Sequence, residues 1–138
     1  MYKFLILLIV LFIMVLADAK VVEMTDGTFY KRIKEQKLWL VVFHAKWCPH
    51  CRTFLKKLDP LSMKLEKIGV HVALIDGSEN PSMAVRFSVK SFPSLFFLDP
   101  SSSTTWIYSD NDRSHDAIVE YASGGYVYHE ELSGVVEI

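Results

Sequence analysis

Both cysteines of this chain lie in one short motif, whose setting restricts the fold more than any other feature of the sequence. Cys48 and Cys51 are separated only by Pro49 and His50. The motif follows an unbroken apolar run, residues 38–43, after a gap of four residues, and it opens a segment whose apolar residues recur at helical spacing. Because the run does not alternate with polar residues, it indicates a central strand that is covered on both faces. The sequence therefore predicts a buried strand that leads directly into a helix carrying both thiols.

Length and composition limit the remaining fold classes. A chain of 138 residues has room for one domain, or for one domain and a targeting segment. The hydrophobic content of 51% excludes a mainly disordered chain. A formal net charge of -1 argues against a nucleic-acid binder, so we expect no nucleic-acid partner. The two cysteines are also too few for a disulfide-stapled miniprotein or for a four-cysteine metal site.

Residues 1–19 show the three-part pattern of a secretory signal peptide. Lys3 supplies the positive start, residues 4–16 form an apolar run of thirteen, and Ala17 and Ala19 frame a signal-peptidase site. The run is shorter than the roughly twenty apolar residues that span a bilayer, although an uncleaved signal anchor stays open as an alternative. We expect the cleaved chain to enter the secretory pathway without attachment to a membrane.

The sequence leaves two destinations open within that pathway. The last four residues, 135–138, do not match the Lys-Asp-Glu-Leu type of retention signal. We therefore expect the protein either to be secreted or to be held in the lumen of the endoplasmic reticulum by other means. Both compartments permit disulfide formation.

After residue 19, strand-like and helix-like segments alternate along the chain. This order predicts an α/β fold in which a central mixed β-sheet is flanked by helices on both faces. The predicted strands are residues 21–24, 38–43, 70–75, 94–98 and 104–108. The predicted helices are residues 29–37, 49–67 with an interruption at Pro60, 81–87 with Asn80 as N-cap, and 114–122. We assign residues 20–125 to one domain and residues 126–138 to a C-terminal acidic tail, whose order the sequence leaves open.

The spacing of the two cysteines predicts an asymmetric, redox-active disulfide. At a helix start, unpaired backbone N–H groups favour the thiolate of Cys48 and lower its pKa. Cys51 lies one turn further in, where it is sheltered and can attack a mixed disulfide. We therefore predict Cys48 as the nucleophile and Cys51 as the resolving thiol. His50, when protonated, adds a charge that favours the Cys48 thiolate and makes the disulfide a better oxidant.

Other uses of a C-x-x-C pair fit the sequence less well. A zinc site would need a second pair or two suitably spaced histidines, and the five histidines lack that spacing, so we expect no metal. A c-type haem would need a histidine directly after Cys51, where this chain has Arg52. A purely structural disulfide across so short a loop would contribute little stability, and it stays open as an alternative. The thiol chemistry itself needs no cofactor.

The motif and its surroundings resemble the thioredoxin superfamily, and most closely a single catalytic domain of a protein disulfide isomerase. Besides Trp47 and the two cysteines, the resemblance rests on V-V-F-H-A-K at 41–46, A-L-I-D at 73–76, F-S-V-K-S-F-P-S-L at 87–95, and on Tyr108, Arg113, Ile118 and Val119. It covers residues 21–121. It implies a thioredoxin fold and a thiol–disulfide oxidoreductase, either oxidase-like or isomerase-like.

The resemblance also implies partners and a substrate surface. Unfolded or cysteine-containing polypeptides would be the substrates, and glutathione or another redox protein would be the electron partner. Pro93 would follow a cis peptide bond and face the cysteines. Phe92 would offer its backbone to an extended substrate. Trp47 would frame the same surface.

Three positions depart from the pattern of the relatives. The buried acid that usually lies beneath the resolving cysteine is replaced by Val42, which cannot accept a proton. The usual kink proline is Lys56, with Pro60 one turn later, and the isomerases' arginine after the last helix has no counterpart near Gly124. We therefore expect Cys51 to lose its proton slowly, which favours a single oxidation step over full isomerase turnover.

Two other functions remain as alternatives at this point. The first is an exported disulfide reductase, which would use the same cysteines in the opposite direction. The second is a redox-poor module that binds client polypeptides in a groove beside Phe92 and Pro93. The reduction potential of the cysteine pair and the fate of bound clients distinguish these functions.

Overall fold

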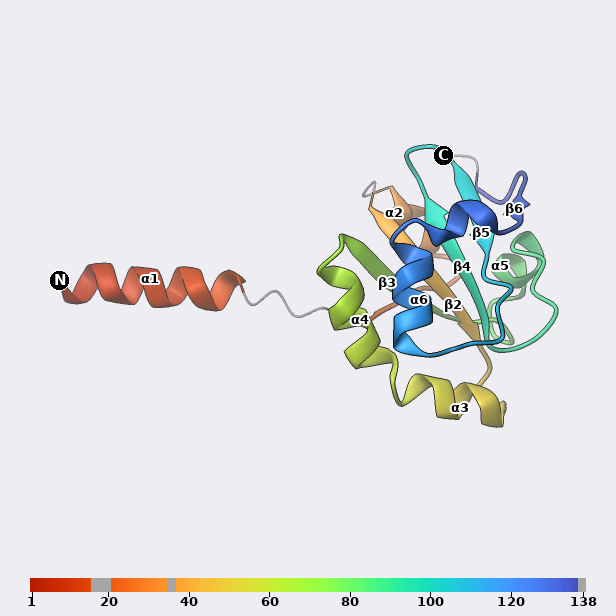
Figure 1. The fold of residues 1–138 in the computed structure, drawn as a ribbon, viewed down its shortest axis with the longest axis horizontal. Coiled ribbons are helices and arrows are strands. Elements are labelled where there is room, and N and C mark those ends of the chain that lie inside the picture. Colours follow the sequence, from red (N-terminus) through yellow and green to blue (C-terminus); the bar gives the residue numbers. More distant parts are fainter. Residues whose placement is uncertain (16–20, 35–36, 137–138) are drawn as a thin grey trace.

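A mixed sheet of six strands lies at the centre of the computed structural model, which describes residues 1–15, 21–34 and 37–136 (Figure 1). The strand order is β1-β3-β2-β4-β5-β6. The first three strands in this order run parallel, and each later strand is antiparallel to its neighbour. The bounds are β1 (Val22–Glu23), β2 (Leu38–His44), β3 (Val70–Asp76), β4 (Ser94–Asp99), β5 (Thr104–Ile107) and β6 (Glu131–Leu132). The five predicted strands are thus confirmed, and β6 is an additional one.

Helices cover both faces of this sheet, as predicted (Figure 1). One face packs against α2 (Phe29–Ile33) and α5 (Pro81–Arg86). The other face packs against α3 (Pro49–Leu55), α4 (Leu58–Glu66) and α6 (His115–Ala122). The chain therefore has the predicted α/β architecture of the thioredoxin fold.

The N-terminal apolar run forms a helix, α1 (Tyr2–Val15). The expected peptidase site at Ala17 and Ala19 lies outside the described residues, so the assignment of residues 1–19 stays a prediction. None of the helices in the described ranges is both long and apolar enough to cross a membrane.

Strand β2 is buried on both of its faces. The side chains of Trp39, Val41 and Phe43 enter the core beneath α2 and α5. Those of Leu40 and Val42 enter the core beneath α3, α4 and α6. All five are at most 2% exposed. This placement confirms the prediction from the apolar run, because a strand with helices on both sides has no need of polar positions.

The predicted helix over residues 49–67 is divided at a different point from the one expected. The break lies at Lys56 and Lys57, and Pro60 is the third residue of α4. Proline fits the first turn of a helix, where a backbone N–H would have no partner within the helix. Further inside a helix its ring would collide with the carbonyl four residues earlier, here that of Lys56. The break therefore precedes Pro60.

The start of α5 is capped by a residue far away in the sequence. Asn80 occupies the N-cap position, but its side chain makes no capping hydrogen bond to α5, contrary to our expectation. The carboxylate of Asp26 instead accepts hydrogen bonds from the backbone N–H groups of Met83 at 3.0 Å and Ser82 at 3.3 Å. The Asn80 side chain accepts from the Asp26 N–H at 2.9 Å. Asn80 thus holds in place the residue that caps the helix.

Residues 126–136, whose order the sequence left open, pack onto the sheet. Tyr126, within the 3₁₀ helix η1 (Gly125–Tyr128), stacks on Phe97 with ring centroids 4.2 Å apart. Strand β6 then pairs with the free edge of β5. Val135 and Val136 are both buried in the core beneath α2 and α5. This segment therefore covers both an edge and a face of the sheet.

The long-range cap predicts a measurable loss of stability. Replacing Asp26 by Ala removes the acceptor for two N–H groups at the start of α5. We expect the free energy of unfolding to fall by about 1–2 kcal/mol, the usual effect of losing an N-cap. Asp26→Asn keeps one acceptor oxygen and should lose less. Urea unfolding measures both variants, with the exposed helical variant Glu120→Ala as the control. Equal stability of Asp26→Ala and Glu120→Ala would contradict the capping role.

Candidate active site

The two cysteines lie where β2 turns into α3. Ala45 follows the strand, and its carbonyl accepts a hydrogen bond from the Cys48 N–H at 3.1 Å. Cys48 is the N-cap of α3, and Pro49 occupies the first turn, where its missing N–H is not needed. Cys51 lies one turn inside the helix, and its N–H points to the Cys48 sulfur at 3.4 Å. The predicted junction of strand and helix is confirmed.

Both cysteines are free thiols, and they are buried to different depths. Cys48 is 5% exposed, and Cys51 is fully buried. Cys48 therefore keeps a small contact with solvent, whereas Cys51 has none.

The segment before β4 faces the thiols from the other side. The peptide bond between Phe92 and Pro93 is cis, as the resemblance implied. The Cys48 thiol donates to the Phe92 carbonyl at 3.5 Å. Two segments more than forty residues apart thus meet at one sulfur atom. The structure brings together the predicted residues of the motif and those of the proline segment.

The aromatic rings of Trp47 and Phe92 lie beside the surface around Cys48. Trp47 is 68% exposed, and its ring meets the Phe92 ring edge-on with centroids 5.9 Å apart. The Phe92 ring in turn lies directly over Gly77, where a Cβ atom would be 2.5 Å from the ring. Sequence reasoning missed Gly77, because its requirement for a small residue comes from a ring fifteen positions away.

The environment shifts the two thiol pKa values in opposite directions. A hydrogen bond from the Cys51 thiol lowers the pKa of Cys48, burial opposes this, and the backbone N–H groups of Cys51 and His50 and the charge of Arg52 lower it further. Burial raises the pKa of Cys51 to about 11, assisted by the hydrogen bond to Cys48 and by the negative charge of Asp76. The asymmetry matches the prediction from the spacing. The contribution of His50 comes from its backbone N–H, and an effect of its ring charge stays a prediction.

A groove of about 330 Å³ runs beside the motif. It is lined by His50, Thr53, Phe54, Lys57, Phe92, Pro93 and Arg113. Arg113 lies over the ring of Tyr108, at 5.0 Å from the centroid, and its carbonyl accepts a hydrogen bond from Lys57 at 3.0 Å. The groove therefore has an apolar floor of rings and basic side chains around it.

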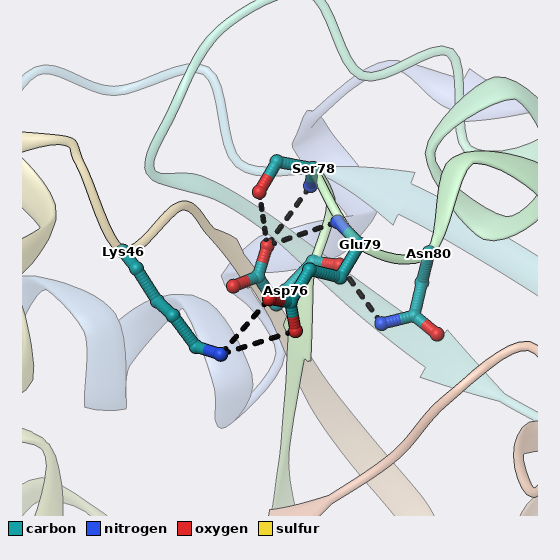
Figure 2. A network of polar contacts seen from close by, with 5 residues as sticks. All are labelled: Lys46, Asp76, Ser78, Glu79 and Asn80. Carbon is teal, nitrogen blue, oxygen red and sulfur yellow. Dashed lines mark hydrogen bonds and ion pairs between the residues drawn. The ribbon is translucent and has the colours of Figure 1, made fainter.

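A polar cluster lies at the carboxyl ends of β2 and β3 (Figure 2). Oδ1 of Asp76 accepts hydrogen bonds from the Ser78 hydroxyl at 2.6 Å, the Ser78 N–H at 3.0 Å and the Glu79 N–H at 3.2 Å. Lys46 forms an ion pair with Glu79 at 3.0 Å, and the Asn80 amide donates to the Asp76 carbonyl at 2.9 Å. Sequence reasoning assigned no role to this cluster.

The carboxyl of Asp76 is held in its ionised form. Burial raises its pKa, but the hydrogen bonds from Ser78 and Glu79 and the nearby His44 outweigh burial and leave the pKa below its usual range. Val42, at the position where relatives carry an acid, is fully buried among apolar side chains. A negative charge thus lies at the end of β3 and not at position 42.

The described residues contain no cluster of side chains suited to bind a metal ion. Within residues 1–15, 21–34 and 37–136, no three His, Cys, Asp or Glu side chains lie close enough together to hold a metal ion.

Comparison with known proteins places this site in a family. The model of the thioredoxin family matches residues 20–123. Protein disulfide-isomerase 1 of Caenorhabditis elegans is 30% identical over 95 residues, which cover 67% of this chain and 20% of that protein. Protein disulfide-isomerase A6 of Mus musculus is 30% identical over 106 residues, covering 74% of this chain and 24% of that protein. The chain therefore spans only about a quarter or less of the length of these relatives.

Solved structures show the same fold. The first thioredoxin domain of mouse protein disulfide-isomerase A4 superposes with a TM-score of 0.66 at 23% identity, covering 84% of this chain and 83% of that domain. The thioredoxin of Trichomonas vaginalis superposes with a TM-score of 0.61 at 27% identity, covering 75% of this chain and 97% of that protein.

The thiol environment predicts how the two cysteines titrate. Because a hydrogen bond from Cys51 is the largest effect on Cys48, Cys51→Ala should raise the pKa of Cys48. Cys51→Ser keeps a hydroxyl donor and should leave that pKa lowered. The rate of alkylation of Cys48 as a function of pH measures it, since only the thiolate reacts. The midpoint should lie below about 8.5 in Cys51→Ser and at a higher pH in Cys51→Ala. Identical midpoints in the two variants would contradict this assignment.

Proposed function

The chain belongs to the thioredoxin family, and we propose that it is a thiol–disulfide oxidoreductase acting on cysteine-containing polypeptides through Cys48 and Cys51. The observation that carries this proposal is the unequal pair of thiols at the start of α3. Cys48 is 5% exposed and has a lowered pKa, and Cys51 is fully buried with a pKa raised to about 11. Relatives named protein disulfide isomerases support the same chemistry, although each is several times longer than this chain.

The reaction follows from the different properties of the two sulfur atoms. The Cys48 thiolate attacks one sulfur of a client disulfide, a bond forms between protein and client, and the second client sulfur leaves as a thiolate. Cys51 then loses its proton and attacks the Cys48 sulfur. The Cys48–Cys51 bond forms as the bond to the client breaks. The client gains two electrons and the protein loses two, and the reverse sequence oxidises a client dithiol.

The proposed substrate surface surrounds the Cys48 sulfur. An extended client segment pairs with the backbone at Phe92, next to the cis bond before Pro93. The exposed ring of Trp47 covers one side of the client, and the groove containing the ring of His50 receives the residues on the other side. Close contact with the cysteine motif and with the segment of Phe92 and Pro93 orients the client sulfur toward Cys48.

We propose oxidation or isomerisation of clients as the physiological direction. A lowered pKa of Cys48 stabilises the reduced form of the protein, which makes its disulfide a better oxidant. Glutathione disulfide, or the disulfide of a partner redox protein, then takes the two electrons and restores the Cys48–Cys51 disulfide. The protein needs no organic cofactor for these exchanges, because the two sulfur atoms carry the electrons.

The proposed location is the secretory pathway. Residues 1–19 act as a signal peptide in this proposal, and they direct the chain to the endoplasmic reticulum lumen or out of the cell. Residues 20–125 form the thioredoxin-like domain, onto which residues 126–136 pack. An oxidising compartment suits a protein whose clients form disulfides.

The proposed roles predict which variant captures clients. Cys51→Ala keeps the nucleophile but cannot release a client, so mixed disulfides should accumulate on Cys48. Cys48→Ala should form none, because Cys51 is fully buried. Non-reducing gel electrophoresis after incubation with scrambled ribonuclease measures the trapped complexes. Equal trapping by both variants would contradict the assignment of nucleophile and resolving thiol.

Assays of turnover distinguish a protein that oxidises or isomerises its clients from one that reduces them. The unmodified chain should regain ribonuclease activity from the scrambled or reduced enzyme in a glutathione buffer. A chain that only reduces insulin would instead be a reductase. Binding of unfolded ribonuclease without any thiol exchange would support the client-binding alternative.

A further inference from the structure

Two buried polar atoms, on residues paired across neighbouring strands, have no hydrogen-bond partner in the described part of the chain. They are Nδ1 of His44 and Oδ2 of Asp76. His44 is the last residue of β2, Asp76 is the last residue of β3, and the two are directly paired in the register of these strands. Buried polar atoms are almost always satisfied, by protein or by ordered water. Two of them at one place require an explanation.

Both residues line the same cavity. It has a volume of about 150 Å³, and Lys46, Glu79 and Glu23 also border it. A buried water needs only about 15 Å³ and two to four polar partners. The cavity therefore has room for water that contacts His44 and Asp76 together. The ion pair of Lys46 and Glu79 is more than half exposed, so this side of the cavity adjoins solvent (Figure 2).

The cavity lies on the side of the sheet that carries Cys51. Along β2 the side chains of Leu40 and Val42 point toward α3 and α4, and His44 continues this alternation. Asp76 lies opposite His44 in the parallel ladder and therefore on the same face. The backbone of Ala45, next to His44, lowers the pKa of Cys51 by hydrogen bonding, and the negative charge of Asp76 raises it.

The resolving step creates a need for a proton acceptor at this place. Cys51 is fully buried, and its pKa of about 11 keeps it protonated near neutral pH. Val42 beneath it is apolar. Histidine is the side chain best suited to exchange a proton near neutral pH, and a neighbouring carboxylate stabilises its charged form.

We propose that His44, supported by the carboxylate of Asp76, accepts the proton of Cys51 through water in this cavity. The inference rests on the proposed function, because it concerns the release of a client from Cys48. The thiol proton of Cys51 passes to the water, and a water proton passes to Nδ1 of His44. The Cys51 thiolate attacks the Cys48 sulfur, the disulfide forms, and the client leaves as a thiolate. In the reverse reaction the same pair returns the proton to Cys51.

The charged groups around the cavity favour this transfer. Asp76 carries a negative charge, because hydrogen bonds hold its pKa below the usual range despite burial. The charge of Lys46 is balanced by Glu79, whose hydrogen bond raises the pKa of Lys46. Glu23 adds a further carboxylate from β1. The carboxylates of Asp76 and Glu23 thus lie at the same cavity as His44, whose partners in the transfer are the water and Cys51.

A chromogenic disulfide separates the two thiol steps in one experiment. When the reduced full chain is mixed with dithiobis(nitrobenzoate), attack by Cys48 releases a first coloured thiolate, and attack by Cys51 releases a second. Stopped-flow absorbance follows both phases as a function of pH. The first phase tests the proposed function, and the second phase tests the proton acceptor.

His44→Phe should leave the first phase unchanged and slow the second near neutral pH by about two orders of magnitude, since a positioned base typically contributes about a hundredfold or more. Its second phase should continue to rise with pH, whereas that of the unmodified chain should level off. Added imidazole should restore much of the lost rate. Asp76→Asn keeps an oxygen for Ser78 and Glu79 but removes the charge, and it should move the midpoint of the second phase to lower pH, because the imidazolium loses its partner.

His71→Gln serves as the matched control, since it removes a histidine at the opposite end of β3 and should leave both phases unchanged. The proposal is overturned if His44→Phe, in a folded protein, retains the second phase and its pH profile. It is also overturned if the rate falls without a change of profile and without rescue by imidazole, because that result shows a structural role. If His44→Phe does not fold, an unchanged midpoint in Asp76→Asn overturns it. Absence of the first phase in the unmodified chain would refute the proposed function itself.

Discussion

The burial of β2 between two layers of helices is the constraint on which the rest of the structure depends. Its side chains enter both cores, so a slip of one residue along β3 or β4 would exchange the two faces and disrupt both. This fixed register determines where the strand ends, and the end of the strand determines where Cys48 lies. The same register places the start of β4 beside β2, which brings the Phe92 carbonyl to the Cys48 sulfur.

One local geometry explains the opposite behaviour of the two thiols. A helix that begins at Cys48 directs backbone N–H groups toward that sulfur and carries the next cysteine into the interior. Burial then makes the thiolate of Cys51 costly, while the hydrogen bond between the two sulfurs favours the thiolate of Cys48. The division of roles therefore needs no charged group beneath the helix. A charged group there would increase the rate at which Cys51 loses its proton, but at position 42 this chain has Val42.

The sequence predicted the features that depend on neighbouring residues, and it missed those that depend on distant ones. The apolar run of β2, the thiols at a helix start and the final helix α6 all follow from local patterns, and the structure contains each of them. The cap supplied by Asp26, the ring of Phe92 over Gly77 and the pairing of His44 with Asp76 each require the register of strands far apart in the chain. Single residues of these pairs carry no signal by themselves. The docking of Val135 and Val136 was missed for the same reason.

The cap of α5 has a consequence for the cooperativity of the fold. The donors of the two hydrogen bonds are more than fifty positions from Asp26, so this helix cannot complete its first turn until the turn after β1 has been brought to it. The six residues of α5 are too few to be stable alone. Opening of the sheet edge at β1 and fraying of α5 are therefore one event with a common free energy. Amide hydrogen exchange would find these two distant segments behaving as a single unit.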